Sequence, residues 1–477
     1  MSFVLEPHLA DHYGVCLVLE TNIKNQLITQ KFRNFSERNI EKFRESVERE
    51  FLDCNPPSRE PNLHAQYLNN YLLKVQNKYF PIMTKKISSK RLNSPWITKQ
   101  ILRCIAKKHR WYRLSRQGII TLNCYKKLSG DLRRLLRKTE EEFYVKKLMS
   151  LGNDCKKNWK ILNRLLNKPR KNSSNSFFIN DETITDQSVI SNAFCDYFVS
   201  NPIRIHDSIP DSSLDFSHLV VHNDNVMAMH PCTNQEISNF IMRTKKQGHM
   251  SDISIKFMKL CLGHVSALLC NLFNNCMEQG IFPDILKLSK IKPVHKKGPS
   301  NTITNYRPIS ILSNISKLFE SVIHSRLHSF FNVQNLLSDR QYGFRKDRST
   351  ELAIFNLLSK ILPAIEHKKY AICLFLDFAS CFDTIDRAIL CSKFDCYGVR
   401  NENLNLIKSY FYNRQQYVYY GEGISKIAGQ NLGVVQGSRL GPLMFDIYSN
   451  DFNNLFQNDI NILYADDACL VYLGDYL

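Results

Sequence analysis

The sequence is poor in the features that mark a membrane-spanning, secreted or zinc-binding chain. None of its apolar runs approaches the roughly 18 uninterrupted residues that a spanning helix needs. Its first residues also lack the basic start and apolar core of a secretory signal. The 15 cysteines include no CxxC pair, and Cys391 with Cys396 has no neighbouring His pair that would complete a zinc site. We therefore expect an intracellular protein of the nucleus or cytoplasm with reduced thiols, not secreted and without a membrane partner.

Acidic residues are scarce in one stretch, residues 85–171. This stretch contains 26 Lys plus Arg against 5 Asp plus Glu, whereas the whole chain of 477 residues has a net charge of +20. Within it Leu128, Leu132, Leu135 and Leu136 recur at helical spacing, which predicts long amphipathic helices with the cations on the outer face. A positive field of this density indicates binding to phosphate backbones, and the alternative is an ordinary solvated helical face.

The pattern elsewhere favours an α+β chain in which the helices come first. Residues 37–51 and 63–80 are predicted helices, and Thr233 with Glu236 has the spacing of a capping box at a helix start. A stretch rich in Pro, Ser and Asn at 167–176 marks a linker. The segments that we predict are 1–20, 21–84 (helical), 85–171 (basic and helical), 172–284 (helical) and 285–477 (mixed strands and helices).

Three aspartates stand at the ends of apolar strands. Asp377 lies at the end of a predicted strand over 370–378, and Asp466 with Asp467 lies between two further short strands. For the adjacent pair the alternative is a hairpin turn, where Asp is common. A carboxylate among apolar neighbours is costly, however, unless it is paired or binds a cation. Three carboxylates on adjacent strand ends predict a site for two Mg²⁺ ions, or Mn²⁺, that acts on phosphate groups.

A glycine-flanked run from Gly433 to Pro442 lies between these aspartates in the sequence, and its glycines would permit close approach of a nucleotide or template. Taken in order, LDFASCFDTID, GVVQGSRLGPLMF and YADD resemble motifs A, B and C of a reverse transcriptase palm. Two upstream strings, NYRPIS at 305–310 and QYGFRKDRST at 341–350, resemble those of non-LTR, LINE-type (jockey-like) retrotransposons. The resemblance covers 285–477. It implies an RNA-directed DNA polymerase with the fingers and palm of a right-hand polymerase.

The resemblance also implies roles for the matching residues. Asp377, Asp466 and Asp467 would be the catalytic carboxylates and the metal ligands, assisted by the backbone carbonyl of Phe378. Phe382 would lie against the sugar of the incoming nucleotide and exclude a ribose 2′-hydroxyl. The alternative for Phe382 is plain core packing.

Polar and basic side chains would bind the substrates, which are a dNTP, an RNA template and a DNA primer. Gln436 would touch the incoming nucleotide, and Arg307 with Lys296 (or the adjacent Lys297) would neutralise its triphosphate. The residues implied along the template and primer are Arg345, Lys346 and Arg348, for each of which a solvated surface turn is the alternative.

This sequence departs from the family pattern at several positions, none of them a metal ligand. Ser380 and Cys381 stand in place of the usual Lys-Ala, Arg387 in place of a common His, and Val435 in place of the usual Pro. At the other end, Leu9-Ala10-Asp11-His12 resembles the close of an apurinic-type endonuclease, and Ser94-Pro95-Trp96-Ile97-Thr98 with the basic helices resembles the connector that follows it.

The resemblance implies a fragment truncated at both ends, because the later palm motifs and the thumb of the family do not follow before Leu477. Two functions are therefore carried forward. The first is polymerisation, and the second is a relic that only binds nucleic acid through residues 85–171. A group II intron maturase or a telomerase palm is disfavoured by the NYRPIS context and by the connector.

Overall fold

The computed structural model describes residues 2–5, 14–17, 27–52, 54–88, 96–152, 155–166, 174, 176–179, 181–210, 218–244, 252–456 and 460–475. The predicted Asp-His at 11–12, the Ser-Pro at 94–95 and most of the predicted linker at 167–176 lie outside these residues. The chain divides into two compact units. The first unit contains residues 1–33 and 82–172, and the second contains residues 34–81 and 173–477.

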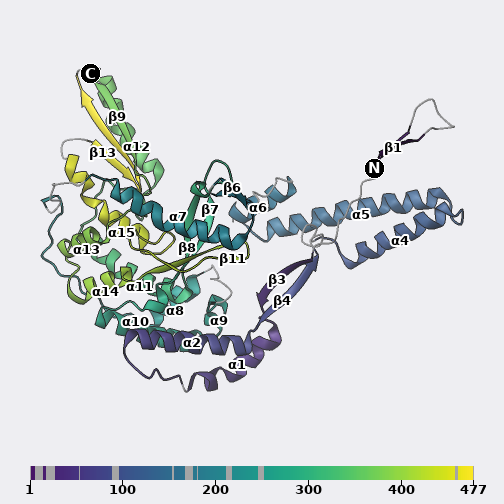
Figure 1. The fold of residues 1–477 in the computed structure, drawn as a ribbon, viewed down its shortest axis with the longest axis horizontal. Coiled ribbons are helices and arrows are strands. Elements are labelled where there is room, and N and C mark those ends of the chain that lie inside the picture. Colours follow the sequence, from purple (N-terminus) through teal and green to yellow (C-terminus); the bar gives the residue numbers. More distant parts are fainter. Residues whose placement is uncertain are drawn as a thin grey trace. The chain divides into compact units, whose positions relative to one another are not determined.

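The described residues of the first unit form two antiparallel strand pairs and three helices. In it α4 and α5 lie side by side as a helical hairpin (Figure 1). The predicted amphipathic helices are confirmed, since Leu132 and Tyr144 of α5 are buried while its Lys and Arg side chains are largely exposed. The elements are β1 (Ser2–Leu5), β2 (Gly14–Leu17), β3 (Leu27–Arg33), β4 (Ile82–Ser88), α4 (Lys99–Arg116), α5 (Leu122–Met149) and α6 (Cys155–Leu165).

The purely helical prediction for residues 21–84 is wrong at both of its ends. β3 pairs with β4 from Leu27↔Ser88 to Arg33↔Ile82. Both strands contain β-branched residues, which suit a pleated ribbon better than a helix. Because the partners are separated by some fifty residues of α1 and α2, a local pattern could not reveal the pairing.

Most helices of the second unit surround one large apolar core, whereas α7 and α12 contribute to two smaller clusters. Phe43, Phe257, Phe319 and Tyr410 are all fully buried in this core, although they come from distant parts of the chain. The helices are α1 (Glu37–Leu52), α2 (Pro61–Tyr79), α7 (Gln187–Asp207), α8 (Asn234–Arg243), α9 (Ile255–Leu260), α10 (Leu262–Gln279), α11 (Asn314–Val333), α12 (Thr350–Glu366), α13 (Arg387–Cys396), α14 (Asn401–Phe411) and α15 (Gly441–Tyr448), with 3₁₀ turns at η2 (Asp284–Leu286), η3 (Ile303–Asn305) and η4 (Asn450–Phe456). Among the described helices, none combines the length and apolar character that crossing a bilayer requires.

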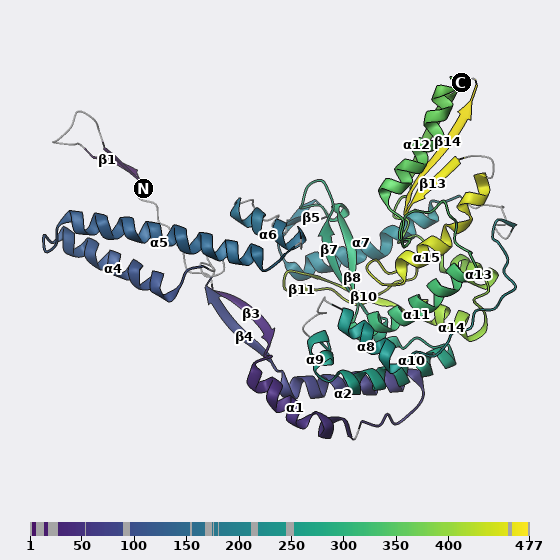
Figure 2. The same cartoon turned by 180° about the vertical axis from the view of Figure 1, so that it is seen from behind.

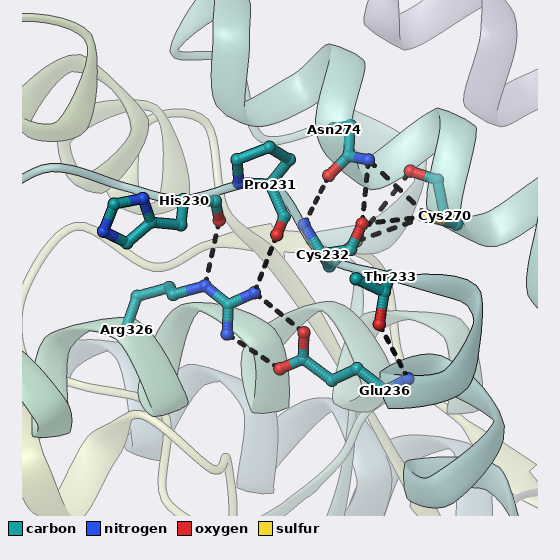
Figure 3. A network of polar contacts seen from close by, with 8 residues as sticks. All are labelled: His230, Pro231, Cys232, Thr233, Glu236, Cys270, Asn274 and Arg326. Atoms are coloured by element: carbon teal, nitrogen blue, oxygen red, sulfur yellow. Dashed lines mark hydrogen bonds and ion pairs between the residues drawn. The ribbon is translucent and has the colours of Figure 1, made fainter.

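A polar network fixes the start of α8 against α11 (Figure 3). The Thr233 hydroxyl accepts a hydrogen bond from the Glu236 backbone N–H at 3.2 Å, so the predicted N-cap is confirmed. The Glu236 carboxylate binds both terminal nitrogens of Arg326 at 2.7 Å. Arg326 also donates to the carbonyls of His230 and Pro231. The glutamate therefore ties two helices together through its side chain.

The strands of the second unit form two main sheets and a hairpin. The larger sheet has the order β11-β10-β7-β8, with β12 also pairing with β10, and the smaller has the order β13-β14-β9 (Figure 2). The hairpin β5–β6 corrects the prediction that 172–284 is entirely helical. The strands are β5 (Phe177–Ile179), β6 (Glu182–Ile184), β7 (Ser289–His295), β8 (Tyr306–Ile311), β9 (Tyr370–Asp377), β10 (Gln415–Tyr420), β11 (Gly423–Ile424), β12 (Ala428–Gly429), β13 (Ile460–Tyr464) and β14 (Asp467–Gly474).

The core can be tested at Phe319, whose ring stacks between Phe273 at 4.6 Å and Phe282 at 5.0 Å. We expect Phe319→Ala to lower the free energy of unfolding by roughly 3–5 kcal/mol, because it leaves a cavity in a filled core. Urea denaturation measures this loss. Phe355→Ala, at a ring that is 71% exposed, is the matched control and should change stability by no more than about 0.5 kcal/mol. Equal losses in the two variants would contradict the assignment of the core.

Candidate active site

The three predicted aspartates meet at one end of the small sheet. β14 pairs with β9 so that Asp467 lies directly opposite Asp377, and β13 pairs with β14 so that Tyr464 lies opposite Asp467. Asp466 occupies the turn between β13 and β14. Directly opposite residues of an antiparallel pair have Cβ atoms about 5 Å apart on one face. The strand ends that carry Asp377 and Asp467 are therefore adjacent, and the site that the three carboxylates were predicted to form stays a prediction.

The turn that carries these aspartates is held by a glutamine that the sequence reasoning missed. Gln341 is 4% exposed, and its side-chain oxygen accepts from the backbone N–H of Ala465 at 2.9 Å and of Gly343 at 2.7 Å. Its side-chain nitrogen donates back to the Ala465 carbonyl at 3.3 Å. Ala465 has a φ of +56°, a conformation that costs energy for a residue with a Cβ. The Gln341 amide thus stabilises a strained residue immediately before Asp466.

The backbone of Gly343 also packs closely against Ala465. A Cβ at Gly343 would lie 2.1 Å from the backbone nitrogen of Ala465. Tyr342 N–H also donates to the Leu463 carbonyl at 2.8 Å, which brings the chain against β13. The string QYGFR therefore packs against the turn that carries the aspartates. Its third residue must be glycine because a side chain there would clash with Ala465.

Two loops of the site are interlocked by backbone and side-chain hydrogen bonds. The loop after β9 provides the Phe382 carbonyl, which accepts from Val434 N–H at 2.8 Å. From the same loop Asp383 accepts from the Gln436 side-chain nitrogen at 2.7 Å. The Gln436 carbonyl in turn accepts from Ser310 N–H of β8 at 2.9 Å. These bonds orient the Gln436 amide, although the sequence reasoning assigned no role to Asp383.

Asp383 is a carboxyl with a raised pKa. Burial raises the pKa to about 6, while the hydrogen bond from Gln436 and the charge of Arg307 act in the opposite direction. Near neutral pH the group is mostly ionised, and it can then accept from Gln436.

Arg387 explains one departure from the family pattern. Its guanidinium donates to four backbone carbonyls, at distances from 2.5 to 3.2 Å. Two of these carbonyls precede the glycine-flanked run, and a third belongs to Gly433, the first residue of the run. The four are those of Phe411, Gln430, Leu432 and Gly433. Burial lowers the pKa of Arg387 to about 10, which leaves it charged at neutral pH. An imidazole at position 387 has only two ring nitrogens and could not donate to four acceptors.

Phe382 lies in an aromatic stack beside the aspartates. Its ring stacks on Phe445 of α15 at 4.6 Å and meets Phe344 edge-on at 5.8 Å. The side chain is partly buried. The packing alternative for Phe382 is thus realised, and a role against the nucleotide sugar stays a prediction.

The residues predicted to bind triphosphate lie on one hairpin, β7–β8. Arg307 is an exposed residue of β8, and its charge acts on Asp383. Lys296 and Lys297 are exposed at the tip, immediately after β7 ends at His295. The structure therefore connects Arg307 with the loop that carries Asp383, while the roles of Lys296 and Lys297 stay predictions.

The three residues predicted along the template and primer differ in what their side chains contact. Arg345 donates to the Ser338 carbonyl at 2.9 Å, and burial lowers its pKa. Arg348 pairs with Asp339 at 2.6 Å. Only Lys346 is largely exposed, with its nitrogen 3.9 Å from an oxygen of the equally exposed Asp347. Two of the three therefore help to hold their own loop, and the predicted binding role of all three stays a prediction.

Divalent ions fit the oxygen ligands at the sheet end, although the carboxylates do not form a closed cage. In the described part of the chain, no group of three or more His, Cys, Asp or Glu side chains is gathered closely enough to hold a metal ion. Burial raises the pKa of the Cys381 thiol to about 12, and the negative charge of Asp466 acts in the same direction. Mg²⁺ is usually bound by one or two carboxylates plus substrate phosphates and waters. Asp377 and Asp467 could provide such a partial set.

Comparison with known proteins agrees with this geometry. Residues 294–475 match the family model described as reverse transcriptase (RNA-dependent DNA polymerase). This part of the chain is thus a reverse transcriptase domain.

Three of the similar curated proteins come from mobile elements of Drosophila melanogaster. The chain is 34% identical over 187 residues to a probable RNA-directed DNA polymerase from transposon BS, which covers 38% of this chain and 20% of that protein. It is 34% identical over 226 residues to that of transposon X-element and 29% identical over 222 residues to that of mobile element jockey, each match covering 46% of this chain and 24% of the relative. Over the matched residues the chain is thus similar to the reverse transcriptases of jockey and related mobile elements, and its match spans about a fifth to a quarter of these relatives' length.

Two solved telomerase structures are more distant. The apo telomerase of Candida tropicalis aligns with a TM-score of 0.30 and 13% identity over 71% of this chain and 79% of that one. The telomerase of Candida albicans with a fragment of telomeric RNA aligns with a TM-score of 0.31 and 12% identity over 79% of this chain and 68% of that one.

The hydrogen bonds of Gln341 can be tested at the turn itself. We expect Gln341→Ala to speed hydrogen exchange of the Ala465 amide and to lower the free energy of unfolding by roughly 1–3 kcal/mol, because it leaves buried backbone groups unsatisfied. Hydrogen-exchange mass spectrometry of the turn peptide measures the local effect. The control is Gln235→Ala at an exposed position of α8, and an unchanged exchange rate in Gln341→Ala would contradict the assigned contact.

A second test concerns Asp446 of α15, which is 3% exposed and has one side-chain oxygen without a hydrogen-bond partner among the described residues. Burial raises its pKa to about 8, although the charge of Arg345 opposes this. A folded-state pKa above the unfolded value of about 3.9 means that the stability contributed by the proton is lost as pH rises through about 8.

We therefore expect Asp446→Asn, which keeps the shape without the ionisation, to gain stability over the native chain as pH rises. The gain in the urea midpoint should be larger at pH 8 than at pH 5. Asp224→Asn, at an exposed aspartate, should show no such trend. A constant difference between native and Asp446→Asn proteins across this range would show that Asp446 is not protonated in the fold.

Proposed function

We propose that the chain is an RNA-directed DNA polymerase of a non-LTR retrotransposon, which adds dNTPs to a DNA 3′-hydroxyl while copying RNA. The observation that carries this is the register that sets Asp467 opposite Asp377, with Asp466 in the adjoining turn. The family match over residues 294–475 and the names of the similar proteins support it.

The proposed site would bind two Mg²⁺ ions, with Mn²⁺ as a substitute, through Asp377, Asp466, Asp467 and the Phe378 carbonyl. Bound ions of this kind activate an attacking hydroxyl and stabilise a leaving pyrophosphate. The aspartates hold carboxylate oxygens at the sheet end, where Asp377 and Asp467 are exposed and reachable by a substrate phosphate.

The remaining residues of the site would bind and orient the nucleotide. Asp383 fixes the Gln436 amide, which would contact the incoming nucleotide, and Arg307 brings a positive charge to the same loop for the triphosphate. Phe382, supported by Phe445, would meet the sugar. Positioning and fixed charge of this kind provide most of the catalysis in phosphoryl transfer.

The proposal places the protein inside the cell, in the nucleus or the cytoplasm. The cysteines that the structure describes are all free thiols, many of them buried, which fits a reducing compartment.

Primer extension on a primed RNA template tests the activity. We expect product with Mg²⁺ or Mn²⁺, and a loss of at least about a hundredfold in Asp466→Asn, because removing a metal ligand costs several kcal/mol of transition-state stabilisation. Asp224→Asn, the same substitution at an exposed residue remote in sequence, should keep full activity. Absence of product from the native chain, or equal product from Asp466→Asn, would overturn the proposal and favour a relic that only binds nucleic acid.

A further inference from the structure

One face of α4 is lined with cations and has no carboxylate. The five residues are all exposed and are Lys99, Arg103, Lys107, Arg110 and Arg113, here called the cationic stripe. At 3.6 residues per turn they fall within an arc of about 120°, and the first and last lie about 21 Å apart along the helix. The whole of α4 contains no Asp or Glu.

The charges of the cationic stripe are not neutralised within the described protein. No ion pair among the described residues includes any of its members. Neighbours three or four residues apart, such as Arg103 and Lys107, are like-charged, and each such pair destabilises a helix by about 0.2–0.5 kcal/mol. Lys99 also begins the helix, where the dipole already presents positive charge.

Helix α1 shows how the same chain builds an ordinary solvated face. Over its 16 residues, ERNIEKFRESVEREFL, basic and acidic side chains alternate closely. Arg38, Lys42 and Arg44, for example, each have a glutamate within four residues. An ordinary solvated surface thus accounts for α1. In α4 the neighbouring cations repel one another, and an external anion would relieve this repulsion.

The kind of anion is indicated by an aromatic residue at the border of the cationic stripe. The Lys107 ammonium lies 4.9 Å from the centre of the Trp111 ring, and this ring is only partly buried. Cations that follow a backbone and a ring on which a base can stack are the two elements of single-strand recognition.

We propose that the cationic stripe of α4 binds single-stranded RNA through its phosphodiester backbone, with Trp111 available for stacking. That this RNA is the template rests on the proposed function. The binding itself does not, because it needs neither the aspartates nor a nucleotide.

The test uses the full chain with Arg103, Lys107 and Arg110 replaced together by Gln, a residue that suits a helix as well as Arg or Lys does. The matched control replaces Arg38, Lys42 and Arg44 of α1 by Gln, which removes the same three charges from another exposed helix. Affinity for a fluorescent single-stranded RNA of about 20 nucleotides is measured between about 50 and 200 mM salt, without primer, dNTP or divalent ion.

We expect the slope of log affinity against log salt to fall by about 2 in the α4 variant, because each lost phosphate contact on a single strand removes about 0.7. The α1 variant should keep the native slope. An unchanged slope in the α4 variant, or an equal fall in both variants, would overturn the proposal. A fall that occurs only with a blunt DNA duplex would overturn the assignment to single-stranded RNA.

The test of RNA binding by the cationic stripe can be distinguished from the test of polymerase activity. Asp466→Asn should bind the RNA as the native chain does, so an inactive enzyme with an intact cationic stripe would still show the salt dependence. Weakened binding in Asp466→Asn equal to that of the α4 variant would place the RNA at the aspartates instead and would contradict the proposal.

Discussion

The register between β14 and β9 is the constraint on which the site depends. It places Asp467 opposite Asp377. Side chains of a strand alternate between two faces, so a slip of one residue would send one of these carboxylates to the other face. Three strands alone specify register weakly, and the additional contact from Gln341 to Ala465 anchors the turn between β13 and β14. The neutral side-chain amide of Gln341 therefore helps to fix the positions of the carboxylates of Asp466 and Asp467.

A comparable arrangement holds the loops around Gln436. Arg387 donates to the backbone carbonyls that lead up to and include Gly433. Gln436 is held by two hydrogen bonds, from its side chain to Asp383 and from Ser310 N–H to its backbone carbonyl. A charged donor satisfies several buried acceptors at once, which is worth more than a neutral bond in the same place. The loop can then keep a defined shape with glycines at positive φ, which would otherwise be free to vary.

The sequence predicted features that depend on a few neighbouring residues. It did not reveal contacts between residues that are far apart in the chain. The strand ending at Asp377 and the Thr233 helix cap follow from patterns only a few residues long, and both are confirmed. Gln341 acts on Ala465 across 124 residues, so no spacing in the sequence could reveal it. The same holds for the pairing of β3 with β4 around two intervening helices. Only its place at the start of the recognised QYGFRKDRST string drew attention to this glutamine, and the string gave it no role.

One strained residue and one repulsive helix of the described chain lie where a ligand would compensate them. Ala465 keeps a positive φ next to the carboxylates, and α4 keeps like charges next to one another, whereas α1 keeps its charges mixed. Native sequences usually agree with their fold at every level and violate local rules at functional sites. These two features lie in different compact units. They support the two separate contacts with phosphate that we propose, one at the aspartates and one along α4.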